Sequence, residues 1–360
     1  MAYMKIKNWS TTAQNNLLTY LLVIVGYVAV QVLLSGGKIN ASMAGLLVPV
    51  CAYVVMALSL NLTVGVMGEL SLGHAGFMSV GAFSGAVVCI SLGGLVDNDI
   101  LRLVIAMIIG AVCAGAAGLL IGIPVLRLKG DYLAIVTLAF GQIIMNILTC
   151  LYVGKDSHGL HVGFLLSGID ALHMEPDAQA IIQGPMGISN IPMISTFTVG
   201  FVLILITLFI ILNLVHSRAG RAIMALRDNR IAAESVGIPA ARYKLMAFVL
   251  SAALAGAAGT LYVMNYSTVV TTRFDYNTSI LILVFVVLGG LGNMWGSILA
   301  AVLLTVLPQL LRQFNDYRML LYAIILILVM LATNNRAVFI KIKNSLLAPW
   351  TGKRGPEKVS

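Results

Sequence analysis

The amino-acid sequence predicts an all-α, polytopic membrane protein with about ten transmembrane helices. Hydrophobic residues make up 60 % of the 360 residues and charged residues only 10 %, whereas a soluble domain carries about 25 % charged residues. Apolar runs of about 20 residues, each long enough to cross the ~30 Å hydrocarbon core of a bilayer, recur along the chain. The predicted spans are 17–35, 43–64, 71–93, 101–123, 132–152, 196–215, 245–264, 278–292, 296–312 and 318–333.

These spans form a transmembrane domain, 17–333, with a tail at 1–16 and a basic tail at 334–360. The first span is not a cleaved signal peptide, because its apolar run exceeds the usual length and further spans follow. Two connections are long. The segment 153–195 is rich in Gly and Pro, so it is expected to be an irregular extracytoplasmic loop, serving either as a connection or as a rim for a partner. The segment 216–244 is expected on the cytoplasmic side.

Lysine and arginine are distributed unequally between the two sides of the predicted membrane. On this topology sixteen of the 22 are cytoplasmic, and the others are Lys38, Arg102, Lys155, Arg273, Arg312 and Arg318. Cytoplasmic loops carry an excess of positive charge, so this distribution predicts a cytoplasmic (inner) membrane protein with both termini inside. The net charge of +9 therefore reflects membrane topology and does not point to nucleic acid.

The basic segment 216–244 contains the longest cluster of charge in the chain. Four apolar residues share one face at helical spacing and predict a short amphipathic helix: Ala222, Ile223, Leu226 and Ile231. Gly237 is expected to end this helix, and Pro239 prevents its continuation. Cations flank it at Arg218, Arg221, Arg227, Arg230, Arg242 and Lys244. We interpret the segment as a docking element for a cytosolic partner.

Polar residues inside the predicted spans are candidates for a substrate path, because each costs free energy in a bilayer. One glycine-rich stretch contains Asn61, Glu69, Ser71 and His74. A carboxylate at the bilayer centre would cost about 3 kcal/mol, so two interpretations stay open for Glu69. It is exposed at a turn between the second and third spans, or it belongs to a broken helix that lines a wet path.

A second set of polar residues comprises Thr137, Gln142, Asn146 and Asn277. Gln142 and Asn146 are four residues apart, so they can face the same side of a helix. Hydrogen bonds between helices and the lining of a path are both consistent with such residues.

Several chemistries lack their sequence signatures. A nucleotide-binding loop needs Gly-Lys followed by Ser or Thr, and none of Lys38, Lys155 and Lys353 is followed in this way. The four cysteines lie in apolar spans without a paired spacing, and the two histidines of His158-x-x-His161 lack further ligands. We expect a chain that is not an enzyme and binds no metal or cofactor itself.

A short internal repeat is also present. The pentapeptide AGAAG occurs at 114–118 and again at 255–259, in two spans that run in opposite directions on this topology. Inverted repeats are common in transporters, so the two copies indicate a possible inverted repeat.

Four segments resemble the M-type permease subunit of the branched-chain amino acid ATP-binding cassette (ABC) importers. They are LNLTVGVMGELSLGHAGFMSVGAF (60–83), GDYLAIVTLAFGQII (130–144), GRAIMALRDNRIAAESVGIPAARYKLMAFVLSAALAGAAGTLY (220–262) and LGGLGNMWGSILAAVLL (288–304). The third is the most specific, because it resembles the loop of ABC permeases whose short helix fits a groove on the ATPase. The resemblance implies an ATPase-docking role for Arg218, Arg221, Arg227, Asp228, Asn229, Ala232, Ala233, Glu234 and Gly237.

The resemblance implies a larger assembly around this chain. Its expected partners are a homologous second permease, two ATPase subunits, an extracytoplasmic solute-binding protein and membrane lipid. ATP and Mg²⁺ would be used by the ATPase, and branched-chain amino acids would pass between the two permeases. Two alternatives stay open: a permease for urea or a related small solute, and an ion-coupled secondary transporter, which would leave the basic helix unexplained.

The charge distribution makes a prediction about topology. In a cysteine-free background, the cysteine of Ser157→Cys should react with an impermeant thiol reagent added outside cells. A cysteine in place of Ser345 should react only after the membrane is permeabilised, because it lies in the cytoplasmic tail. Reversed labelling would contradict the topology and the cytoplasmic place of the docking element.

Overall fold

The computed structural model describes residues 20, 23–34, 36, 41–94, 96–128, 130–156, 159–164, 179–312, 317 and 320–327. Both predicted tails, 1–16 and 334–360, lie outside the described residues. The chain divides into two units, 1–305 and 306–360, each described by itself. The second unit holds the end of one helix and a helical segment over 320–327.

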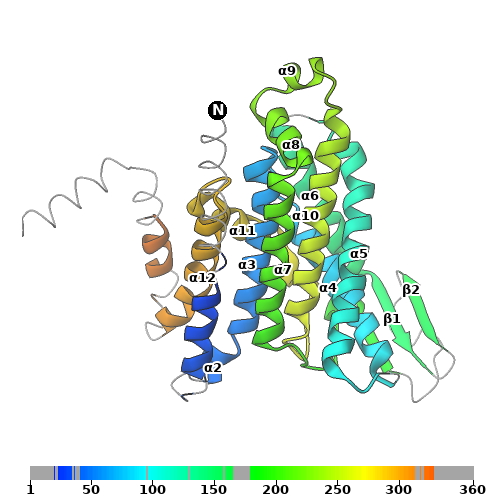
Figure 1. The fold of residues 1–360 in the computed structure, drawn as a ribbon. Helices are drawn as coiled ribbons and strands as arrows, with labels where there is room; N and C mark the ends of the chain where they lie inside the picture. The colour runs from blue at the N-terminus through cyan, green and yellow to red at the C-terminus, as the bar shows by residue number, and fades with distance from the viewer. Residues whose placement is uncertain are drawn as a thin grey trace, which may run out of the picture. The chain divides into compact units, whose positions relative to one another are not determined.

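The first unit is a helical bundle (Figure 1). Its helices are α2 (Ala41–Ala44), α3 (Leu47–Asn61), the π-helix η1 (Leu62–Val66), α4 (His74–Ser91), η2 (Leu92–Gly94), α5 (Asp99–Val125), α6 (Asp131–Thr149), η4 (Gly184–Met186), α7 (Phe197–His216), α8 (Arg218–Asp228), α9 (Arg230–Ser235), α10 (Ala240–Val263), η5 (Thr271–Phe274), α11 (Tyr276–Gly289) and α12 (Met294–Leu310). The mainly helical, polytopic fold that the sequence predicts is therefore confirmed.

Seven segments in the described part are long and apolar enough to cross a membrane. They are Leu47–Val66, His74–Gly94, Asp99–Val125, Asp131–Thr149, Phe197–His216, Ala240–Val263 and Thr271–Gly289. Helices Val23–Leu34 and Met294–Leu310 are apolar but shorter, and most of the last predicted span lies outside the described residues. The predicted count of ten spans is thus not confirmed.

Polar side chains fix where several helices begin. Asn98 Oδ1 accepts hydrogen bonds from the first free amides of α5, at 3.1 and 3.4 Å. Thr196 does the same for α7 and Asp275 for α11. Each of these residues satisfies amides that have no partner within the helix, so the chain leaves the extended conformation at a defined residue.

Helices α4, α5 and α10 pack closely, and glycine makes this possible. A Cβ atom on Gly81 would overlap the backbone of Gly256, and one on Gly256 would lie 2.6 Å from the carbonyl oxygen of Gly110. Helix α3 packs on α10 and α7, and 83 % of its span is buried inside the chain, against 28 % for α6. Small residues thus let the backbones approach where a larger side chain would hold them apart.

The two AGAAG segments lie on these contacting faces. Gly118 of α5 faces Ala252, whereas Gly110, two turns earlier, faces Gly256, so the two helices are antiparallel. The opposite directions predicted for the two copies are therefore confirmed. The inverted repeat of the whole chain stays a prediction.

The predicted irregular loop 153–195 instead contains part of a β-sheet. Strands β1 (Leu151–Lys155), β2 (Leu160–Phe164) and β3 (Gln179–Gln183) are antiparallel, in the order β2-β1-β3. The Gly and Pro residues suggested turns throughout, but backbone pairing between short segments decides the outcome there. The sheet lies at the opposite end of the bundle from α8 and α9 (Figure 1).

The glycine contact yields a prediction about stability. Gly256→Val should destabilise the bundle by about 1–3 kcal/mol or more, because the overlapping groups include backbone, which cannot rotate away. Gly94→Ala is the matched control, since a Cβ there would meet nothing within 4 Å. Thermal unfolding in detergent measures both variants. Equal melting temperatures would show that the helices can separate at no cost.

Candidate functional site

The docking segment, residues 216–244, forms two helices rather than the single helix that the sequence predicts. Asn229 is extended (φ −154°, ψ 103°) and separates α8 from α9. Its side-chain oxygen accepts a hydrogen bond from Ala232 N at 3.1 Å, which starts the second helix. The prediction of one helix is wrong because a residue that caps a new helix interrupts the apolar periodicity.

This break also changes which apolar residues are buried. Ala222, Ile223 and Leu226 are buried against the bundle, as the predicted face requires. Ile231, assigned to the same face, is 82 % exposed, because it belongs to the differently directed α9. A small core supports α9 instead, formed by Leu226, Ala233 and Ala240 with the partly buried Ala225, Ile238 and Tyr243.

Gly237 ends α9, as predicted, with a left-handed backbone (φ +87°). Its N–H donates to Glu234 O at 3.0 Å, and Ile238 N donates to Ala233 O at 3.1 Å. These two bonds close the helix in the pattern known as the Schellman motif. A Cβ on Gly237 would meet no atom within 4 Å, so only the backbone conformation, and not space, requires glycine there.

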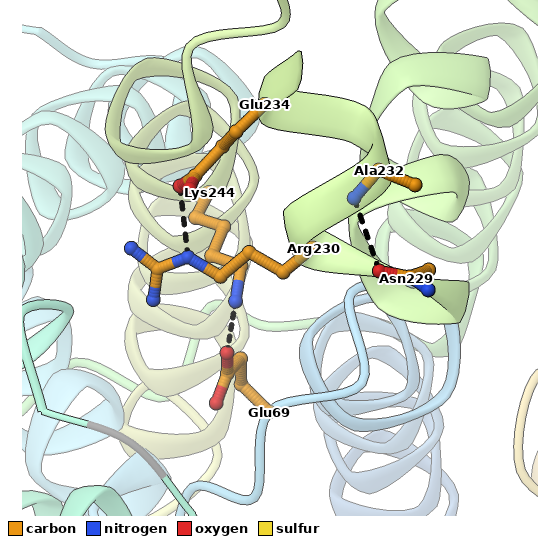
Figure 2. A network of polar contacts seen from close by, with 6 residues as sticks. All are labelled: Glu69, Asn229, Arg230, Ala232, Glu234 and Lys244. Carbon is orange, nitrogen blue, oxygen red and sulfur yellow. Dashed lines mark hydrogen bonds and ion pairs between the residues drawn. The ribbon is translucent and has the colours of Figure 1, made fainter. Parts of the chain in front are cut away.

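The other predicted docking residues lie on the surface of α8 and α9. Arg218, Arg221, Asp228, Ala232 and Glu234 are exposed. Arg221 donates to His216 O at 3.0 Å, and Arg230 pairs with Glu234 at 2.9 Å within α9. Figure 2 shows this pair on α9, with Asn229 and Ala232 beside it. Ala233 is the buried member of the predicted set.

Glu69 lies in the connection between α3 and α4, residues 67–73. The end of α3 widens into η1, where Met67 N donates to Leu62 O, and Glu69 N reaches back to Thr63 O at 3.2 Å. The side chain of Glu69 forms an ion pair with Lys244, in the first turns of α10 (Figure 2). The two side chains are only 15 % and 8 % exposed. The prediction that Glu69 lies between the second and third spans is thus right, but the prediction that its side chain is exposed is wrong.

Four other predicted path residues are buried at helix contacts. Asn61 accepts from Gly292 N at 2.8 Å and donates to Ser297 Oγ at 2.9 Å. His74 shares a 2.7 Å hydrogen bond with Ser59, and Thr137 Oγ1 accepts from Leu72 N at 3.0 Å. Ser71 is buried, and its hydroxyl has no hydrogen-bond partner within the described part of the chain. Asn61, His74 and Thr137 therefore join segments that are distant in sequence.

The remaining candidates for the substrate path do not lie beside these four buried residues. Gln142 is half-buried, and Asn146 is exposed on the same stripe of α6 as Ile135 and Ile143. Asn277 is exposed at the start of α11 and donates to Asp275 at 2.7 Å. The predicted path residues thus fall into a buried set and an outward-facing set.

Sequence reasoning missed the partners of these polar residues. Lys244 was counted as a flanking cation, although it pairs with a carboxylate 175 residues away in the chain. Ser59, Ser251 and Ser297 lie within apolar spans and were not among the predicted residues, yet each forms a hydrogen bond between helices. In the sequence, each of these serines is a hydroxyl group within an apolar run. That pattern predicts a hydrogen bond but does not identify the partner.

The sequence of the whole chain is similar to those of known proteins. The family model described as branched-chain amino acid transport system / permease component matches residues 42–330. The chain is 35 % identical to the high-affinity branched-chain amino acid transport system permease protein LivM of Salmonella typhimurium, over 89 % of this chain and 74 % of that protein. LivM of Escherichia coli shows the same identity and coverage.

More distant similarity extends to other permeases. A probable LivM of Methanocaldococcus jannaschii is 24 % identical over 72 % of the chain and 78 % of that protein. The fructose import permease protein FruG of Bifidobacterium longum is 30 % identical over 33 % of the chain and 37 % of that protein. No solved structure matches the chain. The family match, and the LivM similarity that extends over most of both chains, show that this protein belongs to the branched-chain amino acid transport system permease family.

Proposed function

We propose that this chain is the M-type permease subunit of an ATP-driven importer that moves branched-chain amino acids across the inner membrane. An extracytoplasmic binding protein delivers the substrate, a homologous permease forms the other half of the path, and two ATPase subunits supply the energy with ATP and Mg²⁺. Both termini lie in the cytoplasm. The substrate class comes from the LivM relatives, and the observation that carries the mechanism is the docking segment.

The docking segment has the properties of a surface that receives a protein. Helix α9 packs on a small apolar core and is capped at both ends, so it can move as a rigid element and transmit movement of a bound partner. Ile231 and Val236 are 82 % and 76 % exposed, so this surface presents two large apolar side chains next to charged residues. An apolar anchor within a charged rim is the usual anatomy of a protein interface. We assign the ATPase to this surface.

For the substrate path, we propose the outward stripe of α6 that contains Gln142 and Asn146. The exposed side of α5 carries Ile108, Val112 and Leu120 and suits contact with lipid. Amide side chains within a span rarely face lipid and generally face protein or water. The second permease would therefore cover α6, leaving a path between the two chains. The buried residues Asn61, Ser71, His74 and Thr137, and Asn277 at a helix start, fit structural roles better.

The path assignment predicts a specific loss. Asn146→Leu should reduce uptake several-fold without loss of assembly, because it removes a polar group from the path and keeps the branched side-chain shape. Ile143→Leu, on the same stripe, is the control and should transport normally. Uptake by the assembled complex is the measurement. Normal uptake by Asn146→Leu would move the path away from this face of α6.

The function itself is tested with the complete complex in proteoliposomes. With the second permease, ATPases and binding protein present, labelled leucine, isoleucine and valine should enter only when ATP is hydrolysed. Urea and fructose serve as comparison solutes. Uptake driven by an ion gradient without ATPase subunits would contradict the proposal, and preferential uptake of urea would correct the substrate.

In the same assay, Gly237→Val should insert in the membrane but retain less ATPase. A β-branched residue at φ +87° costs about 1–2 kcal/mol, which disturbs the end of α9. Gly237→Asn is the matched control, because asparagine tolerates a left-handed conformation better. Copurification of the ATPase measures docking. Full retention in Gly237→Val would show that the end of α9 takes no part.

A further inference from the structure

The docking segment is connected to the interrupted region of α3 and α4 by an unusual ion pair. Lys244 follows the docking helices directly, in the first turns of α10, and its ammonium group contacts the Glu69 carboxylate. Both side chains are largely buried. Figure 2 shows the Lys244 side chain meeting the Glu69 side chain. Removing one member of such a pair leaves the other charge uncompensated, so the pair strongly favours one arrangement of the two segments.

Arg227 makes a second connection between the same two regions. Its guanidinium donates to the carbonyl oxygen of Gly65 in η1 at 2.9 Å, across 162 residues of sequence. A Cβ on Gly68 would overlap the Arg227 side chain, so the glycine leaves room for this arginine. The π-helix frees carbonyl groups from regular helical bonding, and Arg227 satisfies one of them.

Two ion pairs within single helices differ in kind. Arg230 and Glu234 are four residues apart on α9, and their side chains are 37 % and 44 % exposed. Asp99 and Arg102 form a pair within the first turn of α5, with Asp99 63 % and Arg102 12 % exposed. Pairs of this kind stay within one helix and contribute little. The Glu69–Lys244 pair instead joins two elements that could move relative to one another.

The connection 67–73 also contacts the rest of the bundle. Leu72 N donates to Thr137 of α6. Just before the connection, Asn61 accepts from Gly292 N in the glycine turn between α11 and α12. A displacement of the connection would therefore reach the proposed path helix and a second helix interruption.

We propose that Glu69, Lys244 and Arg227 are positioning residues that transmit movement of the docking segment to the connection 67–73. This inference rests on the proposed function, because an ATPase must supply the movement. The ion pair holds Glu69 to α10, and Arg227 holds Gly65 of η1, so the start of the connection is tied to the docking segment at two points. These residues need contact neither substrate nor nucleotide.

Two single variants, their combination and a charge exchange test the proposal in the complete complex. Glu69→Gln and Lys244→Met should retain the ATPase and its hydrolysis, but amino acid uptake per ATP hydrolysed should fall about tenfold, a size typical of coupling between two sites. Combining the two should add little further loss, since both remove the same interaction. The exchange Glu69→Lys with Lys244→Glu should restore a large part of the ratio, which a purely local packing role would not predict.

Hydrogen exchange supplies a second measurement that does not depend on uptake. Binding of the ATPase should slow amide exchange in residues 67–73 of the wild-type chain but not in Glu69→Gln. The control is Asp99→Asn, which removes the exposed carboxylate of a pair within one helix and should behave as wild type in both assays.

The outcomes separate this inference from the function on which it rests. A wild-type complex that neither binds ATPase nor imports branched-chain amino acids would overturn both. An active wild-type complex whose Glu69→Gln and Lys244→Met variants keep the normal uptake ratio, and the normal protection of 67–73, would overturn the inference alone. Loss of ATPase binding in the variants, unrestored by the charge exchange, would also overturn it and assign the pair to docking.

Discussion

An interrupted helix inside an apolar bundle must have its free polar groups satisfied by the protein itself, because hydrocarbon offers no substitute. Asn61 meets this constraint for two interruptions at once. Its amide accepts from Gly292 N in the turn between α11 and α12, and donates to Ser297 at the start of α12. The widened end of α3 begins at the next residue. One side chain therefore joins both breaks.

Glycine determines how closely the remaining helices surround these breaks. Where Gly81, Gly110 and Gly256 meet, the backbones of α4, α5 and α10 are separated by less than a side chain. Such contacts leave little freedom for gradual deformation, because a packed interface tends to have discrete arrangements. Movement is therefore expected at the breaks in the helices, where the backbone is irregular, rather than within the glycine-packed core.

The docking segment and the interrupted region can be understood as one unit. Membership of a permease family supplies the expectation of a partner that provides energy, and the geometry supplies a route for it. α9 offers exposed apolar side chains, and Arg227 and Lys244 reach the connection behind it. The same cations that look like a solvated basic patch in the sequence are, in part, internal contacts. Arg227 and Lys244 therefore connect segments that are distant in the sequence.

The sequence by itself determined the properties that depend on neighbouring residues. Apolar runs fixed the main membrane helices, because burial in hydrocarbon is decided by about 20 consecutive side chains. The end of α9 was also predictable, since Gly237 adopts a backbone conformation that few other residues tolerate. Tertiary structure alone decided that Asn61 meets Gly292 and Ser297, and that Glu69 meets Lys244 across 175 residues. Such pairings depend on how distant segments pack, and a one-dimensional pattern contains the donors and acceptors but not the distances between them.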